Sequence, residues 1–194
     1  SDWSSDVCSS DLMDGSGSSA VGRCTELLVP RTCVRPGAFV TGVPKTAIEL
    51  AKRFEGFERK VKRGTEITAV PYICPAGFWT IGYGHLCDSK HPPISEAEAE
   101  VYLACDLQSA VTATLRYCPV LATEPEGRLA AIVDFTFNLG AGRLQTSTLR
   151  RRINQRDWQQ AGVELRRWIY GGGRVLPGLV ARRTREAELL LSRP

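Results

Sequence analysis

The sequence predicts an α+β fold that is mostly helical, with a small β-hairpin lobe beside a larger helical lobe. Apolar residues recur at three- and four-residue steps through much of the chain after residue 95, which is the spacing of amphipathic helices. Residues 71–84 are instead rich in aromatic and β-branched side chains around a Pro-Ala-Gly turn, which is typical of two short strands. A composition of 43% hydrophobic and 24% charged residues is near the globular average and excludes disordered, collagen-like and coiled-coil chains.

The first helix is expected to begin at Thr46. Thr46 and Glu49 have the spacing of a capping box ahead of an amphipathic pattern, and Gly56 is placed to stop the helix. A β-hairpin is expected over residues 71–84, with its turn at residues 75–77.

Two further capping boxes predict the helices that follow the hairpin. Ser95 and Glu98 form one of them, at the start of a long helix that ends at Cys118. Thr123 and Glu126 form the other.

The helix after Thr123 is expected to be central to the fold. Residues 129–139 are apolar on nearly every side, as in a helix buried inside a bundle, and Gly140 and Gly142 end the pattern. Further helical patterns cover residues 148–154, 158–170 and 179–191.

The first 45 residues are not expected to belong to the folded domain, which spans residues 46–194. Residues 1–12 lack periodicity and resemble the translation of a sequencing adapter, so we interpret them as an artefactual leader. Residues 13–45 are rich in Gly, Ser and Pro and predict a disordered tail. We expect no signal peptide, because the N-terminal segment lacks a basic start followed by an apolar stretch of about 7 to 15 residues. We expect no membrane span, because no apolar stretch approaches the roughly 18 to 20 residues that a bilayer requires.

The net charge of +4 is unevenly distributed. Residues 1–44 carry three Arg and five Asp or Glu, so residues 45–194 carry a net charge of +6. A basic domain suits a polyanionic partner, namely nucleic acid, an acidic membrane or the anionic bacterial cell wall. Charge alone does not choose among these partners.

The most informative motifs are Phe54-Glu55-Gly56 at a helix end and Thr80-Ile81-Gly82-Tyr83-Gly84-His85 in the hairpin. Together with later landmarks in the same order, they resemble the phage-type lysozymes, or muramidases, of glycoside hydrolase family 24. Six ordered segments over roughly residues 46–191 make a chance match very improbable. The later landmarks are Ile94-Ser95 with Glu98-Ala99, Phe137-Asn138-Leu139-Gly140, Ser147-Thr148-Leu149 with Asn154, Trp168, and Pro177-Gly178-Leu179 with Arg182-Arg183 and Glu186.

The resemblance implies a lysozyme-like catalytic domain that cleaves the β-1,4 bond between N-acetylmuramic acid and N-acetylglucosamine. The family's catalytic glutamate, aspartate or cysteine, and threonine fall on Glu55, Cys74 and Thr80. A glycoside leaving group must be protonated as its bond breaks, so one carboxylic acid has to keep its proton near neutral pH. Glu55 fits this role, since Phe54 and Phe57 can supply apolar surroundings that disfavour the carboxylate.

Cys74 and Thr80, at the second and third catalytic positions of the family, have different chemistry. Thr80 carries a hydroxyl that can orient a water molecule. Cys74 stands where a carboxylate is the usual base, and a thiol with a reference pKa of about 8.5 is a poorer one. Cys74 therefore assists the reaction, only shapes the site or is a buried structural cysteine. Glu58, Glu66 and Asp88 remain weak candidates for a replacement carboxylate.

The interval between Glu55 and Cys74 holds 18 residues, which is longer than is usual in the family. The excess falls at residues 59–70, a charged stretch with Lys60 and Lys62. A longer β-hairpin or loop at the cleft edge is the simplest account, because insertions in surface loops cost little. Its basic residues either bind anionic wall polymer or are simply solvated.

No cofactor or metal is expected. His85 and His91 are the only histidines, and a zinc site needs about three or four ligands. No Gly-x-Ser-x-Gly elbow for a serine nucleophile is present. The seven cysteines have irregular spacing and are expected to remain reduced thiols. The arginines at 150–152 and at 182, 183 and 185 are expected to form a solvated basic face rather than a nucleic-acid site.

The resemblance thus implies an endolysin-type muramidase of phage or prophage origin that lyses the host cell. Its expected partner is the peptidoglycan glycan strand, which it meets as a monomer in a cleft between the lobes. We expect it in the host cytoplasm, with a holin-type pore giving access to the periplasm and wall. The alternatives are a lytic transglycosylase, in which the substrate's own 6-hydroxyl attacks, and a catalytically inactive peptidoglycan-binding protein. The sequence assigns no substrate-binding residues.

Overall fold

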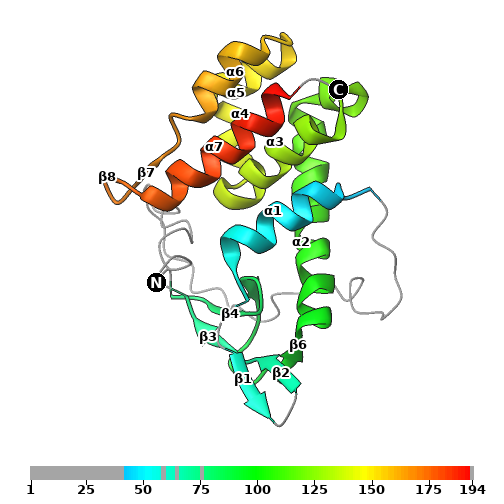
Figure 1. The fold of residues 1–194 in the computed structure, drawn as a ribbon, viewed down its shortest axis with the longest axis vertical. Helices are drawn as coiled ribbons and strands as arrows, with labels where there is room; N and C mark the ends of the chain where they lie inside the picture. Colours follow the sequence, from blue (N-terminus) through cyan, green and yellow to red (C-terminus); the bar gives the residue numbers. More distant parts are fainter. Residues whose placement is uncertain (1–41, 58–59, 64–65, 75–76, 193–194) are drawn as a thin grey trace, which may run out of the picture.

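The computed structural model describes residues 42–57, 60–63, 66–74 and 77–192. The expected leader (1–12), almost all of the expected tail (13–45) and two of the three expected turn residues (75–77) lie outside the described residues. Figure 1 shows two lobes, with the short strands β1 to β6 in the smaller one and most helices in the larger one. This confirms the predicted α+β class.

Helix α1 (Lys45–Glu55) ends where the sequence predicts, at Gly56 with a φ of 70°. Its expected capping box is wrong. Pro44 is the residue before the first turn and no side chain caps the helix. Thr46 lies inside the first turn, and its hydroxyl donates to Glu126 Oε1 at 3.4 Å instead.

The insertion forms a β-hairpin of its own. Strands β1 (Lys60–Arg63) and β2 (Glu66–Ala69) are antiparallel, and β2 also pairs with β6 (Ile94–Ser95). Of the two forms that the sequence allows for residues 59–70, hairpin or loop, the structure has the hairpin.

The expected hairpin of residues 71–84 is confirmed and gains a third strand. Strands β3 (Tyr72–Ile73), β4 (Trp79–Ile81) and β5 (His85–Leu86) form an antiparallel sheet in that order. Gly82, with a φ of 64°, lies in the turn from β4 to β5, and a Cβ there would lie 2.8 Å from the Cβ of Ala99. The turn therefore packs tightly against the next helix.

Helix α2 (Glu96–Tyr117) has the predicted capping box of Ser95 and Glu98. A short 3₁₀ helix, η1 (Pro119–Thr123), follows it. The other expected capping box is wrong, because Thr123 ends η1 and Pro125 precedes α3 (Glu126–Leu139).

Helix α3 is buried along most of its length, as its apolar sequence predicts. It packs against α1, α2 and α7. Gly142 does not end this helix but lies inside a further short helix, α4 (Ala141–Thr146), that the sequence pattern does not predict.

The remaining helices are α5 (Thr148–Asn154), α6 (Trp158–Leu165) and α7 (Pro177–Leu191). Helix α6 is shorter than predicted, and Tyr170, the last residue of the predicted helix, is instead in the hairpin of β7 (Tyr170–Gly171) and β8 (Arg174–Val175), which turns at Gly172 and Gly173. Both glycines have positive φ, which favours this turn over a continued helix. None of the described helices has the length and apolarity to span a membrane.

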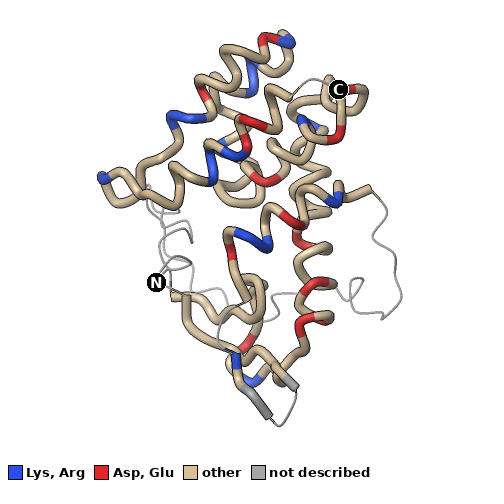
Figure 2. The backbone as a smooth tube through the Cα atoms, in the orientation of Figure 1, with Lys and Arg blue, Asp and Glu red and all other residues tan. Residues whose placement is uncertain are grey.

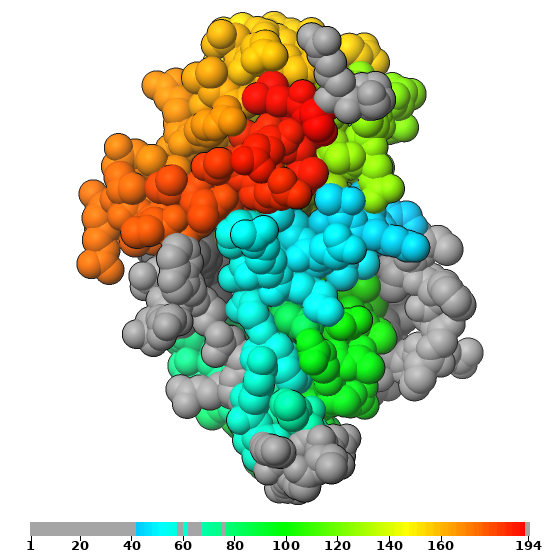
Figure 3. Space-filling model, viewed as in Figure 1, coloured from blue at the N-terminus to red at the C-terminus, as the bar shows by residue number. Residues whose placement is uncertain are grey.

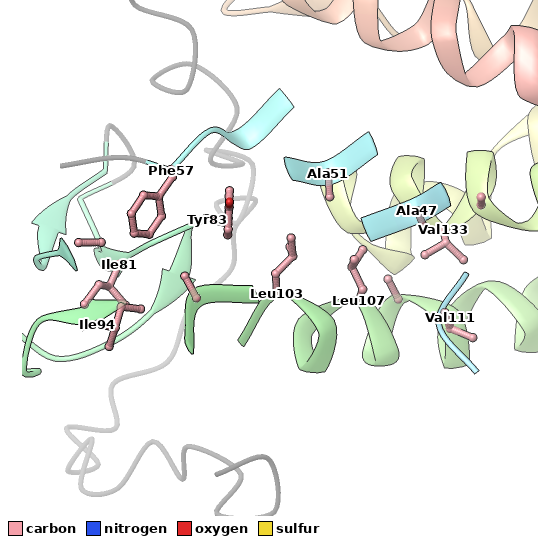
Figure 4. Packing of buried hydrophobic residues seen from close by; sticks show 14 residues of the cluster. Ala47, Ala51, Phe57, Ile81, Tyr83, Ile94, Leu103, Leu107, Val111 and Val133 are labelled. Carbon is pink, nitrogen blue, oxygen red and sulfur yellow. The ribbon is translucent and has the colours of Figure 1, made fainter. Parts of the chain in front are cut away.

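Helix α2 joins the lobes through one hydrophobic cluster (Figure 4). At one end the cluster contains Phe57, Ile81 and Tyr83 of the small lobe. Along α2 it continues to Ala47 of α1 and Val133 of α3. A second cluster fills the helical lobe. The end of α1 and strand β4 are thus anchored in the same core.

Candidate active site

Glu55 is the last residue of α1, and its side chain is 20% exposed. Arg182 of α7 donates from Nη1 to Glu55 Oε1 at 2.6 Å. Figure 3 shows the atoms of α1 lying directly against those of α7, so this contact bridges two packed helices. Glu55 is therefore held by a cation and still reaches solvent on one side.

The guanidinium of Arg182 has a second partner on α3. Its Nε and Nη2 donate to the two carboxylate oxygens of Asp134, each at 2.8 Å. Burial lowers the pKa of Arg182, but the charges of Asp134 and then Glu55 raise the pKa more, so it lies above its ordinary value. Arg182 is thus a permanent cation fixed between α1, α3 and α7, where Figure 2 shows basic positions of α7 beside an acidic position of α3.

Asp134 is fully buried and ionised. Burial raises the pKa of Asp134, but the charge and hydrogen bonds of Arg182, a hydrogen bond from Glu186 and the charge of Arg183 together outweigh it, so the pKa lies below its ordinary value. A buried carboxylate with two charge-assisted hydrogen bonds is a rigid anchor for its partner.

The surroundings expected for Glu55 are only partly present. Phe57 packs in the core, with its ring centroid 5.6 Å from that of Tyr83. The ring of Phe54 lies against the guanidinium of Arg182, at 5.4 Å from its centroid. Glu55 therefore has an aromatic neighbour but also a positive charge within hydrogen-bond distance.

The prediction of a solvated basic face is wrong for Arg182 and Arg183, which are 3% and 0% exposed. Arg183 donates from Nη2 to Asn138 Oδ1 at 2.6 Å, and its guanidinium lies over the ring of Phe135. A signal for this was present: Asp134 and Asn138 are four residues apart in an otherwise apolar helix, so they share one face. Buried polar groups require partners, and arginines elsewhere in the chain could supply them.

Cys74 and Thr80 lie on one face of the β3–β4 pair. Thr80 is opposite Tyr72 in the register, and its hydroxyl donates to Tyr72 O at 3.4 Å. Cys74 follows two residues after Tyr72, and its N–H donates to the carbonyl of Phe78, so the pairing continues. Because side chains alternate along a strand, Cys74 and Thr80 point to the same side. Both are buried, at 4% and 0% exposure.

Glu55 and Thr80 each lie close in sequence to an aromatic residue of the same hydrophobic cluster. Glu55 is two residues before Phe57, Thr80 is three residues before Tyr83, and the rings of Phe57 and Tyr83 are in contact. The segment that follows α1 and the turn that follows β4 therefore meet in one packing contact.

The weaker carboxylate candidates gain no support. Glu58 lies outside the described residues, and Glu66 is the first residue of β2. Asp88 is exposed after β5 and accepts a hydrogen bond from the N–H of Lys90 at 2.6 Å.

The histidines have structural contacts. His85 Nδ1 lies 2.9 Å from Asp106 Oδ2, and the His85 ring packs on Tyr102 at 4.5 Å. These contacts tie β5 to α2. Within the described ranges, no group of three or more His, Cys, Asp or Glu is arranged to hold a metal ion.

No disulfide joins the four described cysteines, which are Cys74, Cys87, Cys105 and Cys118. Burial raises the pKa of Cys118 to about 12. Burial, assisted by the charge of Asp88, raises the pKa of Cys87 to about 11. Neither of these two is a reactive thiolate at neutral pH.

An open groove of about 420 Å³ lies on another face of α1, lined in part by Lys52, Phe57 and Tyr83. Its lining includes none of the residues Glu55, Cys74 and Thr80. The groove is therefore separate from the candidate active site.

Comparison with known proteins identifies the family. The phage lysozyme family model matches residues 52–186. The endolysin of Bacillus phage B103 is 36% identical over 152 residues, which cover 77% of this chain and 54% of the relative. The SAR-endolysin of Bacteriophage PS119 is 38% identical over 124 residues, which cover 62% of this chain and 72% of the relative. The chain thus spans about half the length of the B103 endolysin.

Solved structures agree with this result. The muramidase domain of SpmX from Asticaccaulis excentricus has a TM-score of 0.65 and 26% identity, over 78% of this chain and 99% of that domain. The endolysin from Escherichia coli O157:H7 phage FAHEc1 has a TM-score of 0.62 and 27% identity, over 77% of this chain and 93% of that structure. Since the family model spans more than half of the chain, and the fold and motifs agree, this chain belongs to the phage lysozyme family.

Proposed function

We propose that this protein is an endolysin-type muramidase of glycoside hydrolase family 24, which hydrolyses the β-1,4 bond between N-acetylmuramic acid and N-acetylglucosamine in peptidoglycan. The observation that carries the proposal is Glu55 at the end of α1, partly exposed and held by Arg182, in a chain of the phage lysozyme family. The names of the relatives, endolysin and muramidase, support the same activity.

Glu55 is the general acid in this proposal. It protonates the glycosidic oxygen while the bond to the anomeric carbon breaks, which avoids an unstable alkoxide leaving group. To do so it must exchange its ion pair with Arg182 for a proton. Arg182 can release Glu55 without losing all its partners, because two of its nitrogens stay hydrogen-bonded to Asp134.

Thr80 positions the attacking water. Its hydroxyl is 0% exposed and lies 3.4 Å from the Tyr72 carbonyl oxygen, at the outer limit for a hydrogen bond, so a water molecule has to enter this face and displace that weak contact to bind it. The water oxygen then bonds to the anomeric carbon and loses a proton to solvent or to a neighbouring base.

Cys74 shapes the site rather than acting as the base. It lies on the face of Thr80 and is almost fully buried. A thiol has a reference pKa of about 8.5 and is therefore a poorer base at neutral pH than the carboxylate usual at this position. A role in packing beside the water therefore fits its position better than proton transfer.

The setting of the activity is also part of the proposal. The enzyme acts as a monomer on glycan strands between its two lobes. It is held in the host cytoplasm until a holin-type pore gives access to the wall. The endolysin names of its relatives support a role in host lysis. Expression with and without a holin, followed by culture turbidity, tests this route.

The direct test compares the wild type with Glu55→Gln on permeabilised Gram-negative cells. The wild type should clear the suspension, and the variant, which cannot donate a proton, should lose at least about 10²-fold in rate. Mass spectrometry of the released muropeptides should show reducing ends. Anhydro ends would instead indicate a lytic transglycosylase, and wall binding without clearing would contradict any catalytic role.

A further inference from the structure

The groove beside α1 is a feature of the fold that the proposed mechanism does not use. It has a volume of about 420 Å³, and its lining includes one side of α1, Glu96 at the start of α2 and Lys60 at the start of β1. Lys60 belongs to the insertion hairpin of residues 59–70. The insertion therefore supplies part of the lining of this groove.

The floor of the groove is aromatic and firmly held. Phe57 and Tyr83 line it, and Figure 4 shows their rings side by side, with centroids 5.6 Å apart. They are 8% and 4% exposed, so only a small part of each ring reaches the groove. The Tyr83 hydroxyl donates to Glu96 Oε1 at 2.7 Å, which fixes that carboxylate on the wall.

Two cations of the lining lack an acidic partner. Lys52 forms an ion pair with Glu100, which is outside the lining. Arg53 and Lys60 are exposed instead, and no carboxylate of the described residues lies within ion-pair distance of either side chain. The ammonium of Lys60 lies 5.6 Å from the centroid of the Phe57 ring, at the edge of the aromatic floor. Both cations can therefore bind an anionic group without breaking an existing ion pair.

The lining also carries two carboxylates, which limit the chemistry of the occupant. Glu49 is exposed one turn before Arg53 on α1, and Glu96 is exposed on the opposite wall. Nucleic acid or an anionic lipid surface would be repelled by both carboxylates, and a neutral sugar would use none of these charges. A short peptide that carries both carboxylate and ammonium groups complements charges of both signs.

Building on the proposed activity on peptidoglycan, we propose that this groove binds the peptide stem of the substrate. The stem is attached to N-acetylmuramic acid, and in Gram-negative walls its glutamate and diaminopimelate residues carry free carboxylates and one free amino group. Arg53 and Lys60 bind the carboxylates of the stem. Glu49 and Glu96 face its ammonium group, and its aliphatic chains lie on the rings of the floor.

The peptide stem is long enough to reach the groove from a glycan bound at Glu55. At 3.6 residues per turn, Arg53 and Glu55 project from nearly opposite sides of α1, about 200° apart. A helix with its side chains is about 10–12 Å across, and an extended peptide spans about 3.3 Å per residue. Three or four peptide residues therefore reach the groove by passing over Gly56, which has no side chain.

A titration with free peptide tests the site without any hydrolysis. The tripeptide L-alanyl-γ-D-glutamyl-meso-diaminopimelic acid is added to the full chain, and the amide resonances of Arg53, Phe57 and Tyr83 are followed by NMR. The double variant Arg53→Gln, Lys60→Gln should bind about tenfold more weakly, since two exposed charge pairs are lost. No shift at these three residues, or equal affinity in both proteins, would overturn the proposal.

The double variant Arg116→Gln, Arg185→Gln is the matched control. It removes the same two positive charges from exposed positions outside the groove, so its affinity for the tripeptide should equal that of the wild type. Arg116 lies over the ring of its neighbour Tyr117, just as Arg53 lies over that of Phe54. An equal loss of affinity in both double variants would show that net charge alone attracts the peptide, and would overturn the site.

Changing the ligand tests the recognition of both charges without any variant. The tripeptide acetylated on its diaminopimelate amino group should bind up to about fivefold more weakly, because Glu49 and Glu96 lose their cationic partner. Inorganic phosphate should not shift the three resonances at the concentrations at which the tripeptide does. Equal binding of the acetylated peptide, or of phosphate, would overturn the assignment to a zwitterionic peptide.

Hydrolysis distinguishes this proposal from the proposed function. The kcat/KM is measured on glycan strands that carry their stems and on strands from which an amidase has removed them. The wild type should prefer the strands with stems, and the double variant at 53 and 60 should reduce that preference by about tenfold. An equal preference in both proteins would overturn the stem site. A wild type that cleaves neither substrate would contradict the muramidase, and the tripeptide titration would then decide the site by itself.

Discussion

Arg182 and Glu55 are 127 positions apart in the sequence, yet Nη1 of one donates to Oε1 of the other at 2.6 Å. The contact exists only when α7 packs beside α1. Because Asp134 holds the other edge of the same guanidinium, α3 fixes the direction in which Arg182 points. The position of the proposed catalytic acid is thus set by the last helix of the fold.

Replacing Arg182 should damage both stability and activity. Arg182→Ala leaves Asp134 as a buried carboxylate without its cation, which typically costs about 3–5 kcal/mol. Arg182→Lys should recover little, since an ammonium cannot form the two parallel hydrogen bonds. Urea unfolding measures the loss. Arg185→Ala is the control, because Arg185 is exposed and its pair with Glu188 should contribute under about 1 kcal/mol. Equal effects at 182 and 185 would contradict the anchoring role.

The turn before β5 should be intolerant of a side chain at Gly82. A Cβ there would lie 2.8 Å from the Cβ of Ala99, and the φ of 64° is also strained for other residues. Gly77→Ala is the matched control, with a φ of 86° but open space around the added carbon. Gly82→Ala should therefore cost about 1–3 kcal/mol more than Gly77→Ala in thermal unfolding. Equal losses of stability in the two variants would show that the positive φ, and not the contact with Ala99, determines the cost of the added Cβ.

The stability of the protein should fall as pH rises, because of Glu186. Its pKa is raised in the folded state, so its contribution is fully present below the pKa of an unfolded glutamate, about 4.3, and is lost as pH rises through the folded value. Between these two values the free energy of unfolding should decrease by up to about 1.4 kcal/mol per pH unit relative to Glu186→Gln. Urea unfolding of both proteins from pH 5 to 9 checks this. Parallel curves would indicate that Glu186 ionises normally in the fold.

Local signals predicted most helices, but two predicted helix starts were wrong where a proline precedes the helix. The capping box of Ser95 and Glu98 is confirmed, since nothing between these residues competes with it. The same spacing failed for Thr46 and Thr123. In both cases a proline, Pro44 or Pro125, is the residue before the first helical turn. The spacing of a capping box therefore indicates that a helix begins nearby but does not fix its first residue.

The proposed catalytic residues could be identified from motifs, whereas the residues that hold them in place could not. Glu55 and Thr80 lie in short conspicuous segments. The partners of Arg182 are 48 and 127 residues away, so no local pattern links the three. In the sequence, Asp134 is recognisable only as a charged residue within the apolar pattern of residues 129–139. A polar residue inside such a pattern predicts a buried partner, but the partner's identity depends on tertiary packing.

Thr80 and Cys74 should differ in their effect on the reaction. Thr80→Val keeps the shape of a buried side chain but removes the hydroxyl that positions water, so kcat on peptidoglycan should fall by about 10²-fold or more. Cys74→Ala removes only a buried thiol that shapes the site, and its kcat should stay within about tenfold of the wild type. Both variants are compared at equal fraction folded, measured by circular dichroism. If Cys74→Ala lost as much activity as Thr80→Val, Cys74 would have to take part in proton transfer.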